Sequence, residues 1–295
     1  MEAGNAGIGG ADVLAERIAV RAGATRILRG VSLHARPGQL VGILGPSGSG
    51  KSTLLNVLSG ALAPSRGRVR VDGAHVRDVL QSAGSAIGYV PQEDIVHGHL
   101  SVANALMYAA QLRLPAHWDE GRLRAHVNGV LHLLELGPRA RAKIRTLSGG
   151  ERKRANIGVE LVGRPRLLLL DEPAAGLDPT LERKLMTLFR GLADGGRTVI
   201  LSTHVMGTLD VLDSVVVLSD GLVAFDGPLP DALRFFHASH PAEIYDRLRD
   251  SPQKVRGRPL TASRRGADPW GQALPACRRT QGSPRHTEPQ AAKVS

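Results

Sequence analysis

The chain has 295 residues, a hydrophobic fraction of 42% and a formal net charge of +11, values that suit a globular protein with a sizeable core. No apolar run approaches the length of a membrane span, the N-terminal segment does not resemble a signal peptide, and the single cysteine, Cys277, excludes an internal disulfide. Seven of the eleven formal charges come from residues 251–295, which hold nine Lys and Arg against two acidic residues. We therefore expect a soluble cytoplasmic protein, and the charge excess does not indicate a basic nucleic-acid-binding domain.

The first part of the chain predicts strands followed by a helix. Alternating apolar and polar residues over 14–44, with turn residues at Gly23 and Pro37-Gly38, predict short antiparallel strands. The continuous apolar run Leu40–Leu44 predicts a buried strand, and leucines at helical spacing predict a helix over 51–59. Strand, glycine-rich loop and helix form the context that a phosphate-binding loop requires.

The loop between this strand and helix matches the pattern G-x-x-x-x-G-K-[ST]. Its glycines let successive backbone N–H groups turn toward phosphate oxygens, and the start of the helix adds partial positive charge. Lys51 would supply a charge for the β- and γ-phosphates, and the Ser52 hydroxyl can ligate Mg²⁺. The alternative is a strand-to-helix turn with an incidental lysine. The candidate nucleotide-binding residues are Gly45, Pro46, Ser47, Gly48, Ser49, Gly50, Lys51, Ser52 and Thr53.

The middle of the chain alternates between strand and helix patterns. Residues 67–72, Ile87–Val90, 167–170 and Thr198–Ser202 are predicted strands, and helical periodicity marks 101–136 and 181–192. Two short apolar runs flank Asp220-Gly221, which is a hairpin signal. The basic, proline-rich residues 251–295 show no apolar periodicity and predict a disordered tail without function, with binding to anionic lipid or nucleic acid as the alternative.

Two carboxylates, Asp171 and Glu172, end the predicted strand of leucines. Buried charge is costly unless it is paired or bound to metal, so we expect Asp171 to hold Mg²⁺ through water and Glu172 to polarise an attacking water. The alternative is a pair of ordinary solvated acids. Gln92 and His204 each follow a predicted strand and could reach the metal, the water or the γ-phosphate, although either residue alone would be taken as structural.

A second candidate anion site is Ser148-Gly149-Gly150, which precedes a helix predicted to begin near Glu151. One nucleotide would not need both sites within one chain. We therefore predict a head-to-tail dimer, in which the loop of residues 45–53 of one copy faces these three residues of the other. On its own, the segment would be interpreted as a serine N-cap with turn glycines.

These motifs, in this order, resemble the nucleotide-binding domain of an ABC transporter ATPase. The resemblance covers residues 12–245 and includes the signature Leu-Ser-Gly-Gly-Glu and the stretch Ala-Gly-Leu-Asp at 175–178. Val-Pro-Gln-Glu-Asp and Gly-Gly-Glu-Arg-Lys-Arg are similar to the G subfamily, of the white and pleiotropic-drug-resistance type, and to bacterial relatives with an ABC-2-type permease. The implied fold is α/β, a P-loop NTPase (RecA-like) core with an antiparallel β subdomain and a helical insert at about 99–160, followed by the tail 251–295.

The resemblance also implies a function. An ATP-binding and ATP-hydrolysing subunit, with ATP and Mg²⁺ as cofactors, would energise transport, usually export, through a separate membrane permease. Glu172 would be the general base, His204 the γ-phosphate sensor and Gln92 a third catalytic residue, while Ser52, Gln92 and Asp171 would hold the metal. Ser148, Gly149 and Gly150 would act on the nucleotide of the second copy.

The expected partners are an ABC-2-type membrane permease subunit and a second ATPase copy, identical or not, without nucleic acid, at the cytoplasmic face of the membrane. Two alternatives remain. A soluble ABC ATPase working on DNA or ribosomes would need a coiled-coil insertion or two ATPase halves, and neither pattern is present. A non-hydrolysing ATP-binding regulatory module would not need the complete catalytic set.

The sequence departs from the family pattern in three places. Ala22, with Arg21 beside it, occupies the place of the aromatic residue that usually stacks on adenine, and Ala174-Ala175 replaces the usual Thr-Ser. Where G-type members commonly continue into membrane helices, this sequence has its basic tail. We therefore expect the permease to be another polypeptide; the alternative is that this reading frame has lost it.

Overall fold

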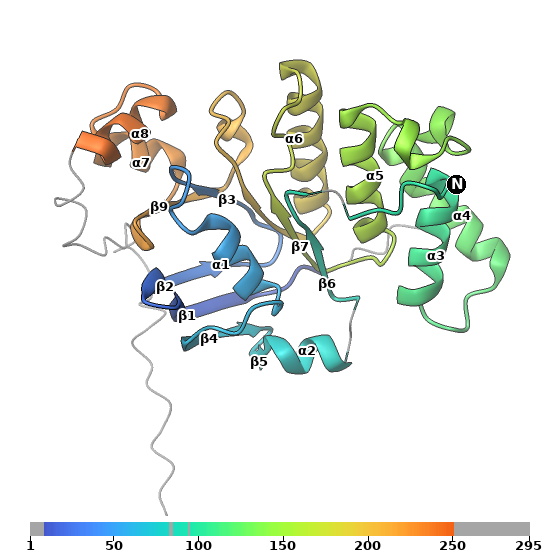
Figure 1. The fold of residues 1–295 in the computed structure, drawn as a ribbon, viewed down its shortest axis with the longest axis horizontal. Coiled ribbons are helices and arrows are strands. Elements are labelled where there is room, and N and C mark those ends of the chain that lie inside the picture. Colours follow the sequence, from blue (N-terminus) through green and yellow to red (C-terminus); the bar gives the residue numbers. More distant parts are fainter. Residues whose placement is uncertain (1–8, 83–84, 94, 251–295) are drawn as a thin grey trace, which may run out of the picture. The chain divides into compact units, whose positions relative to one another are not determined.

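Two β-sheets organise the protein. The computed structural model describes residues 9–82, 85–93 and 95–250, all of which belong to the first of the chain's two units, Met1–Ala262. The predicted tail, 251–295, lies outside the described residues. Figure 1 shows the elements with their labels.

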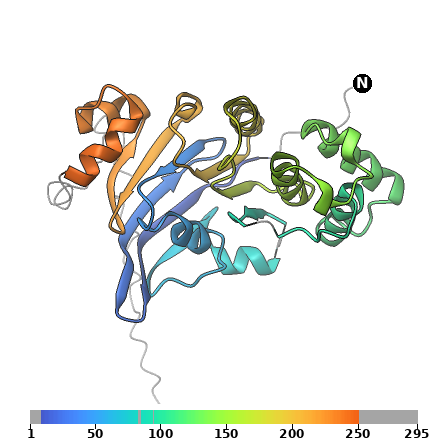
Figure 2. The same ribbon diagram turned by 45° about the horizontal axis from the view of Figure 1, so that its top comes forward.

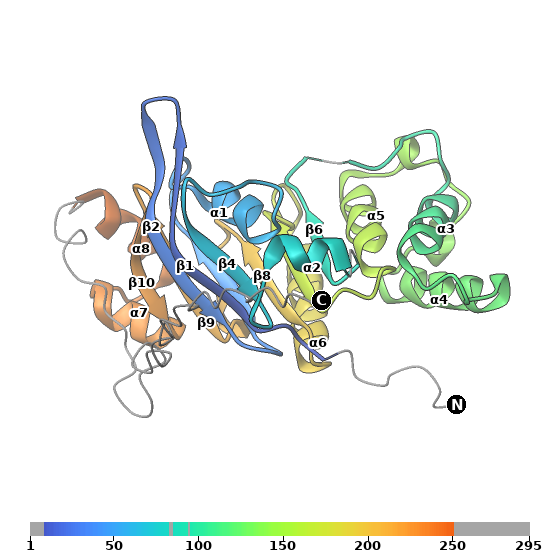
Figure 3. The same cartoon turned by 90° about the horizontal axis from the view of Figure 1, so that it is seen from below.

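The smaller sheet has four antiparallel strands in the order β2-β1-β4-β5. Its strands are β1 (Val13–Ala22), β2 (Thr25–Ala35), β4 (Arg66–Val71) and β5 (Ala74–His75). Alternation along the strands places Ile18, Val20 and Leu28 in one buried cluster with residues of helix α1 (Lys51–Leu58). In Figure 3 these strands lie in front of α1, so that their other face points toward the viewer. The antiparallel strands predicted from the alternation are therefore present.

The larger sheet has six strands in the order β10-β9-β3-β8-β7-β6. Its strands are β3 (Leu40–Leu44), β6 (Ile87–Val90), β7 (Leu167–Asp171), β8 (Thr198–Ser202), β9 (Ser214–Ser219) and β10 (Leu222–Gly227). Only β10 runs antiparallel, through the predicted hairpin with β9. Every residue of β3, β7 and β8 is buried, as expected for parallel strands covered on both faces. Because β3, β8 and β7 are neighbours, their carboxyl ends meet at one edge.

Helices surround the larger sheet. Helices α3 (Val102–Arg113) and α4 (Glu120–Leu133) lie in the region predicted to be a helical insert, and they pack against each other and against α5 (Gly149–Leu161). The 3-10 turns Gly137–Arg139 and Ile144–Thr146 lie between α4 and α5 in the chain. Helix α6 (Pro179–Asp194) packs beside β8, and a 3-10 turn, Leu209–Val211, precedes β9. Figure 2 shows α3, α4 and α5 (green) on the opposite side of the strands from the C-terminal helices (orange).

Three helices have no counterpart in the sequence predictions: α2 (Val76–Ser82), α7 (Leu229–Phe236) and α8 (Pro241–Asp250). Helix α7 packs near β9 and β10, and Phe235 and Phe236 form an aromatic cluster with Phe225. Ile244 and Leu248 of α8 are buried in the same core. Within the described part of the chain, no helix is both long enough and apolar enough to span a membrane.

Candidate active site

The glycine-rich loop leaves the carboxyl end of β3 and leads into α1. Gly45, its first residue, has φ of +151°, and a Cβ atom there would lie 2.3 Å from the carbonyl oxygen of Leu218. Gly50, the residue before α1, has φ of +102° and would place a Cβ atom 2.7 Å from the Leu28 side chain. Only glycine therefore permits this path of the backbone at both ends of the loop.

Lys51 lies across the loop that precedes it. Its side chain is buried, and Nζ donates hydrogen bonds to the carbonyl oxygens of Gly45 at 2.8 Å and Pro46 at 3.2 Å. Burial lowers the pKa of Lys51, and the nearby carboxylates of Glu172 and Asp171 oppose this shift. The ammonium group is thus desolvated and held by two neutral acceptors, an arrangement that favours its transfer to a more strongly charged acceptor such as a phosphate.

The loop has the donors that an anion requires. No side chain caps the N-terminus of α1, whereas Ser101, Asp119, Ser148 and Asp178 cap α3, α4, α5 and α6. The first N–H groups of a helix have no partner within it, so those of α1 are available to an anion. Ser49 Oγ, buried in the same loop, has no hydrogen-bond partner among the described residues. The residues present therefore fit a bound phosphate chain.

The acidic pair, Asp171 and Glu172, lies at the carboxyl end of β7, two strands away from β3 in the sheet. Asp171, its last residue, is 3% exposed, and its Oδ1 accepts a hydrogen bond of 2.6 Å from Ser202 Oγ. The same hydroxyl oxygen accepts a hydrogen bond of 2.9 Å from the backbone N–H of Glu172. Glu172 has φ of +49°, a left-handed conformation that costs a non-glycine residue roughly 1–2 kcal/mol. This left-handed residue forms a bend directly after Asp171.

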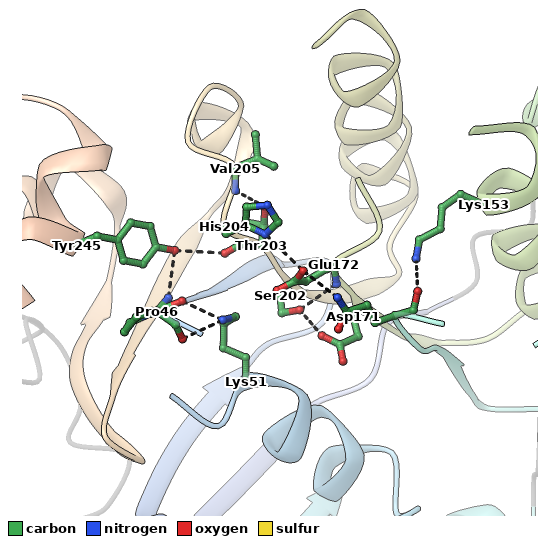
Figure 4. A network of polar contacts seen from close by, with 12 residues as sticks. Pro46, Lys51, Lys153, Asp171, Glu172, Ser202, Thr203, His204, Val205 and Tyr245 are labelled. Atoms are coloured by element: carbon green, nitrogen blue, oxygen red, sulfur yellow. Dashed lines mark hydrogen bonds and ion pairs between the residues drawn. The ribbon is translucent and has the colours of Figure 1, made fainter. Parts of the chain in front are cut away.

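Gln92 and His204 converge on the Glu172 carboxylate, as Figure 4 shows for His204. Gln92 Nε2 donates a hydrogen bond of 3.3 Å to Glu172 Oε2, and His204 Nδ1 lies 3.4 Å from the same oxygen. Gln92 and His204 are exposed and Glu172 is half-buried. Gln92 and His204, which follow β6 and β8, therefore meet at the half-buried carboxylate of Glu172, which follows β7.

The segment Ser148-Gly149-Gly150 lies at the start of α5 and makes no hydrogen bond to this cluster among the described residues. Ser148 Oγ accepts from the backbone N–H of Glu151 at 3.2 Å, and Glu151 Oε2 accepts from the backbone N–H of Ser148 at 2.9 Å. This is a capping box. The N-cap interpretation of Ser148 is therefore correct as local structure, and a role toward a second copy is compatible with it.

Three residues near the site were not among the sequence predictions. Ser202 joins Asp171 to the Glu172 backbone, and Lys153 Nζ donates a hydrogen bond of 2.9 Å to the carbonyl oxygen of Gln92. Tyr245, on α8, accepts a hydrogen bond of 3.2 Å from the Gly45 N–H and donates one of 3.4 Å to the Thr203 carbonyl oxygen (Figure 4). Burial raises the pKa of Tyr245, which keeps its hydroxyl protonated as a donor.

Sequence signals for these three residues differ. Lys153 stands within Gly-Gly-Glu-Arg-Lys-Arg and Ser202 at the end of a buried strand beside that of Asp171, so each had a recognisable position. Tyr245 had none, because its partners are 200 and 42 positions away in the chain.

Comparison with known proteins identifies the family of this chain. The profile of the ABC transporter family matches residues 28–175. The chain belongs to this family. It contains the ATP-binding domain of an ABC transporter, and the nucleotide-binding ATPase cassette predicted from the motifs is confirmed.

The similarity extends to full-length transporters. Rv1747 of Mycobacterium tuberculosis, an ABC transporter ATP-binding/permease protein, is 42% identical over 262 residues, which cover 88% of this chain and 30% of that protein. ABC transporter G family member 14 of Arabidopsis thaliana is 37% identical over 218 residues, covering 71% of this chain and 33% of that protein. The chain thus spans about a third of the length of these relatives.

Solved structures confirm the fold class. The ATP-binding subunit of an ABC transporter superposes with a TM-score of 0.72 at 25% identity, covering 81% of this chain and 99% of that one. The dimeric ATP-binding cassette MJ0796, in a post-hydrolysis state with ADP and Pi, gives a TM-score of 0.69 at 28% identity, covering 74% and 98%. The ABC cassette described above therefore has the α/β fold of a P-loop NTPase.

Proposed function

We propose that this ABC ATPase hydrolyses Mg²⁺-ATP at two sites shared between two copies, and that hydrolysis drives export through an ABC-2-type membrane permease on a separate polypeptide. The observation that carries the proposal is the gathering of Lys51, Asp171, Glu172, Gln92 and His204 at the edge where β3, β8, β7 and β6 end. Transfer of a phosphoryl group depends on positioning and charge stabilisation, which these side chains supply.

In this proposal the glycine-rich loop and the N-terminus of α1 bind the phosphates, and Lys51 moves from the Gly45 and Pro46 carbonyl oxygens to the β- and γ-phosphates. Asp171, the Ser52 hydroxyl and the Gln92 amide would hold Mg²⁺, which supplies positive charge against the phosphate oxygens. The described residues contain no cluster of three or more His, Cys, Asp or Glu that could hold a metal alone. That fits Mg²⁺, which commonly uses one or two carboxylates and completes its coordination with phosphate and water.

Glu172 has the geometry of a general base. Its Oε2 already accepts a hydrogen bond from Gln92, and His204 lies beside it, so the carboxylate is oriented before substrate binds. A water held by Glu172 would lose its proton to the carboxylate as its oxygen attacks the γ-phosphorus. The bond between the γ-phosphorus and the oxygen that bridges it to the β-phosphate would break, which would release ADP and inorganic phosphate. His204, exposed at the end of β8, would contact the γ-phosphate.

The glycines of the signature support a site shared between two copies. A Cβ atom on Gly150 would lie 2.4 Å from Leu181 Cδ2, so contact with α6 within one chain accounts for this glycine. A Cβ atom on Gly149 would meet nothing within 4 Å. Gly149 is also exposed, and the close approach of a phosphate on a second copy explains why this position has no side chain.

Exposed apolar side chains suit a membrane partner. Leu112 on α3 is 87% exposed, and Ile95, three residues after Gln92, is 55% exposed. The Ile95 backbone N–H donates to Asn156 on α5, and Lys153 on the same helix holds the Gln92 carbonyl oxygen. A permease that contacts Ile95 would therefore be linked through short contacts to Gln92. The relative named an ATP-binding/permease protein supports such a partner.

The test is the Glu172→Gln variant. We expect it to bind ATP, to dimerise in ATP and Mg²⁺, and to turn over at least about 100-fold more slowly than the wild type, because the base is lost and the shape is kept. Size-exclusion chromatography and phosphate release measure these properties. Wild-type-like turnover in the variant would remove Glu172 from its role, and no phosphate release by the wild type, with or without a permease, would favour a non-hydrolysing regulatory module.

A further inference from the structure

Six arginines surround a hollow on the smaller sheet. The hollow has a volume of about 890 Å³, and its lining includes Arg17, Arg21, Arg26, Arg29, Arg66 and Arg68 with Glu16 as its one carboxylate. All six arginines are exposed. Such a concentration of one sign of charge around a concave surface is a candidate for anion binding.

Strand register brings these arginines together on one face. Arg21 of β1 lies directly opposite Arg26 of β2, and Ala19 lies opposite both Arg29 of β2 and Arg66 of β4. The neighbouring residues Ile18, Val20 and Leu28 belong to the buried cluster shared with α1. Successive side chains alternate between faces, so Ala19 and Arg21, which flank Val20, lie on the face away from α1. Side chains directly opposite one another share a face, which places Arg29, Arg66 and Arg26 there as well, and a further register shift between Val20 and Arg21 brings Arg26 opposite Arg21.

The hollow is formed by an irregularity in the sheet. The pairings of β1 with β2 and with β4 shift register between Ala15 and Ala19. Arg17 lies in this segment with φ of +49°, and on the opposite strand a Cβ atom on Gly67 would be 2.4 Å from the Glu16 carbonyl oxygen. A β-bulge bends a strand and redirects its side chains, which here turns a flat face into a concave one.

Most of these charges have no ion-pair partner in the part of the chain that the structure describes. Arg68 and Arg70 pair with Glu16. Arg21, Arg26, Arg29 and Arg66 form no ion pair with any described residue. Like charges directly opposite one another in a sheet are destabilising, so an anion bound between them would remove a repulsion as well as form new contacts.

We propose that this hollow binds a compact anion with several phosphate groups, either a free polyphosphate or the headgroup of a phosphorylated lipid. Guanidinium groups match phosphate oxygens with two parallel hydrogen bonds, which accounts for the use of arginine. Among the described residues, the lining carries no aromatic ring, which disfavours single-stranded nucleic acid because its binding sites stack bases on aromatic side chains. The tail 251–295 is excluded as the occupant because it carries the same sign of charge.

The test compares two double variants with equal loss of charge. Arg21→Gln with Arg26→Gln removes the opposed pair, and Arg122→Gln with Arg183→Gln removes two exposed cations on α4 and α6 that are distant from the hollow in the chain. Binding of inorganic tripolyphosphate is measured by calorimetry in saturating ADP, which occupies the glycine-rich loop. A second arm measures flotation with phosphatidylcholine vesicles, with and without phosphatidylinositol bisphosphate.

We expect the hollow variant to bind about 30-fold more weakly than the wild type and the control variant to bind less than about threefold more weakly. Without ligand, the hollow variant should unfold about 1–3 °C higher, because a like-charge pair has been removed. Binding in the first arm alone identifies a free anion, and binding to the vesicles identifies a lipid headgroup. Three results would overturn the proposal. Both variants could lose affinity equally, the wild type could bind neither tripolyphosphate nor the vesicles, or it could bind a single-stranded oligonucleotide as tightly as tripolyphosphate. ADP binding, measured separately, shows whether the nucleotide site is intact.

Discussion

Gly149→Ala separates stability from activity at the signature of this ABC ATPase. The added methyl group would meet no atom within 4 Å in one copy, and Gly149 is the first residue of α5, with φ outside the left-handed region. Alanine is therefore compatible with the folded chain. In the proposed dimer, the same methyl group would occupy space needed by the phosphates bound to the second copy.

Gly149→Ala should leave the unfolding temperature unchanged or raise it slightly, and it should lower the rate of ATP turnover. Glycine is about 1 kcal/mol less favourable than alanine inside a helix and less so at its first residue, so the variant should unfold at the wild-type temperature or up to about 2 °C above it. Loss of one charge-assisted hydrogen bond to phosphate costs roughly 1.5–3 kcal/mol, which corresponds to a decrease in turnover of about 10- to 150-fold.

Thermal unfolding and steady-state phosphate release test this prediction, together with ATP-dependent dimerisation of a Glu172→Gln background. Gly129→Ala is the matched control, because Gly129 lies inside α4 and its Cβ atom would also meet nothing within 4 Å. This control should unfold about 2–4 °C higher with unchanged turnover. If Gly149→Ala hydrolysed ATP as fast as Gly129→Ala, the site shared between copies would be refuted.

Three further predictions follow from single contacts. Ser202→Ala leaves buried Asp171 without its hydroxyl donor, so the unfolding temperature should fall by roughly 5 °C. Ser82→Ala, at an exposed helix position, is the control and should not change it. Equal shifts in the two variants would contradict the role of Ser202 as the donor to Asp171. Burial raises the pKa of Asp226 to about 6, a shift that the nearby His34 opposes. The stability that this raised pKa contributes is present at low pH and lost as pH rises through about 6. Asp226→Asn should therefore gain about 3 kcal/mol relative to the wild type between about pH 4 and pH 8, as measured by urea unfolding, and a pH-independent difference would contradict the shift. Tyr245→Phe keeps the ring and removes both hydrogen bonds of the hydroxyl, so hydrogen exchange of the Gly45 amide should accelerate at least about fivefold. The stoichiometry of nucleotide binding should not change. Unaltered exchange would show that the hydroxyl does not hold the loop.

The local motifs could be predicted because their chemistry is local. A phosphate-binding loop needs glycines, a lysine and a helix start within nine residues, and Gly45 to Thr53 contain all of them in order. The strands at Leu40–Leu44 and Thr198–Ser202 were predictable for a similar reason, since uninterrupted apolar runs between turn residues are typical of parallel strands covered on both faces. Helices α7 and α8 were missed, although Leu229–Phe236 is strongly amphipathic, because each is short, Pro230 lies within the first turn of α7 and α8 begins at Pro241.

By itself, then, the sequence determined the chemistry of the site, namely which side chains can bind phosphate, hold a metal or accept a proton, because these properties depend on residue type and short spacing. Only the tertiary structure decided which of them meet. The strand order β3-β8-β7-β6 places Gln92 and His204 beside one carboxylate oxygen of Glu172. It leaves Ser148 to Gly150 outside that cluster. Strand register likewise set Arg21 against Arg26 and folding of α8 onto the core brought Tyr245 to Gly45. Contacts of this kind depend on strand order, register and packing over tens to hundreds of residues, which no local pattern specifies.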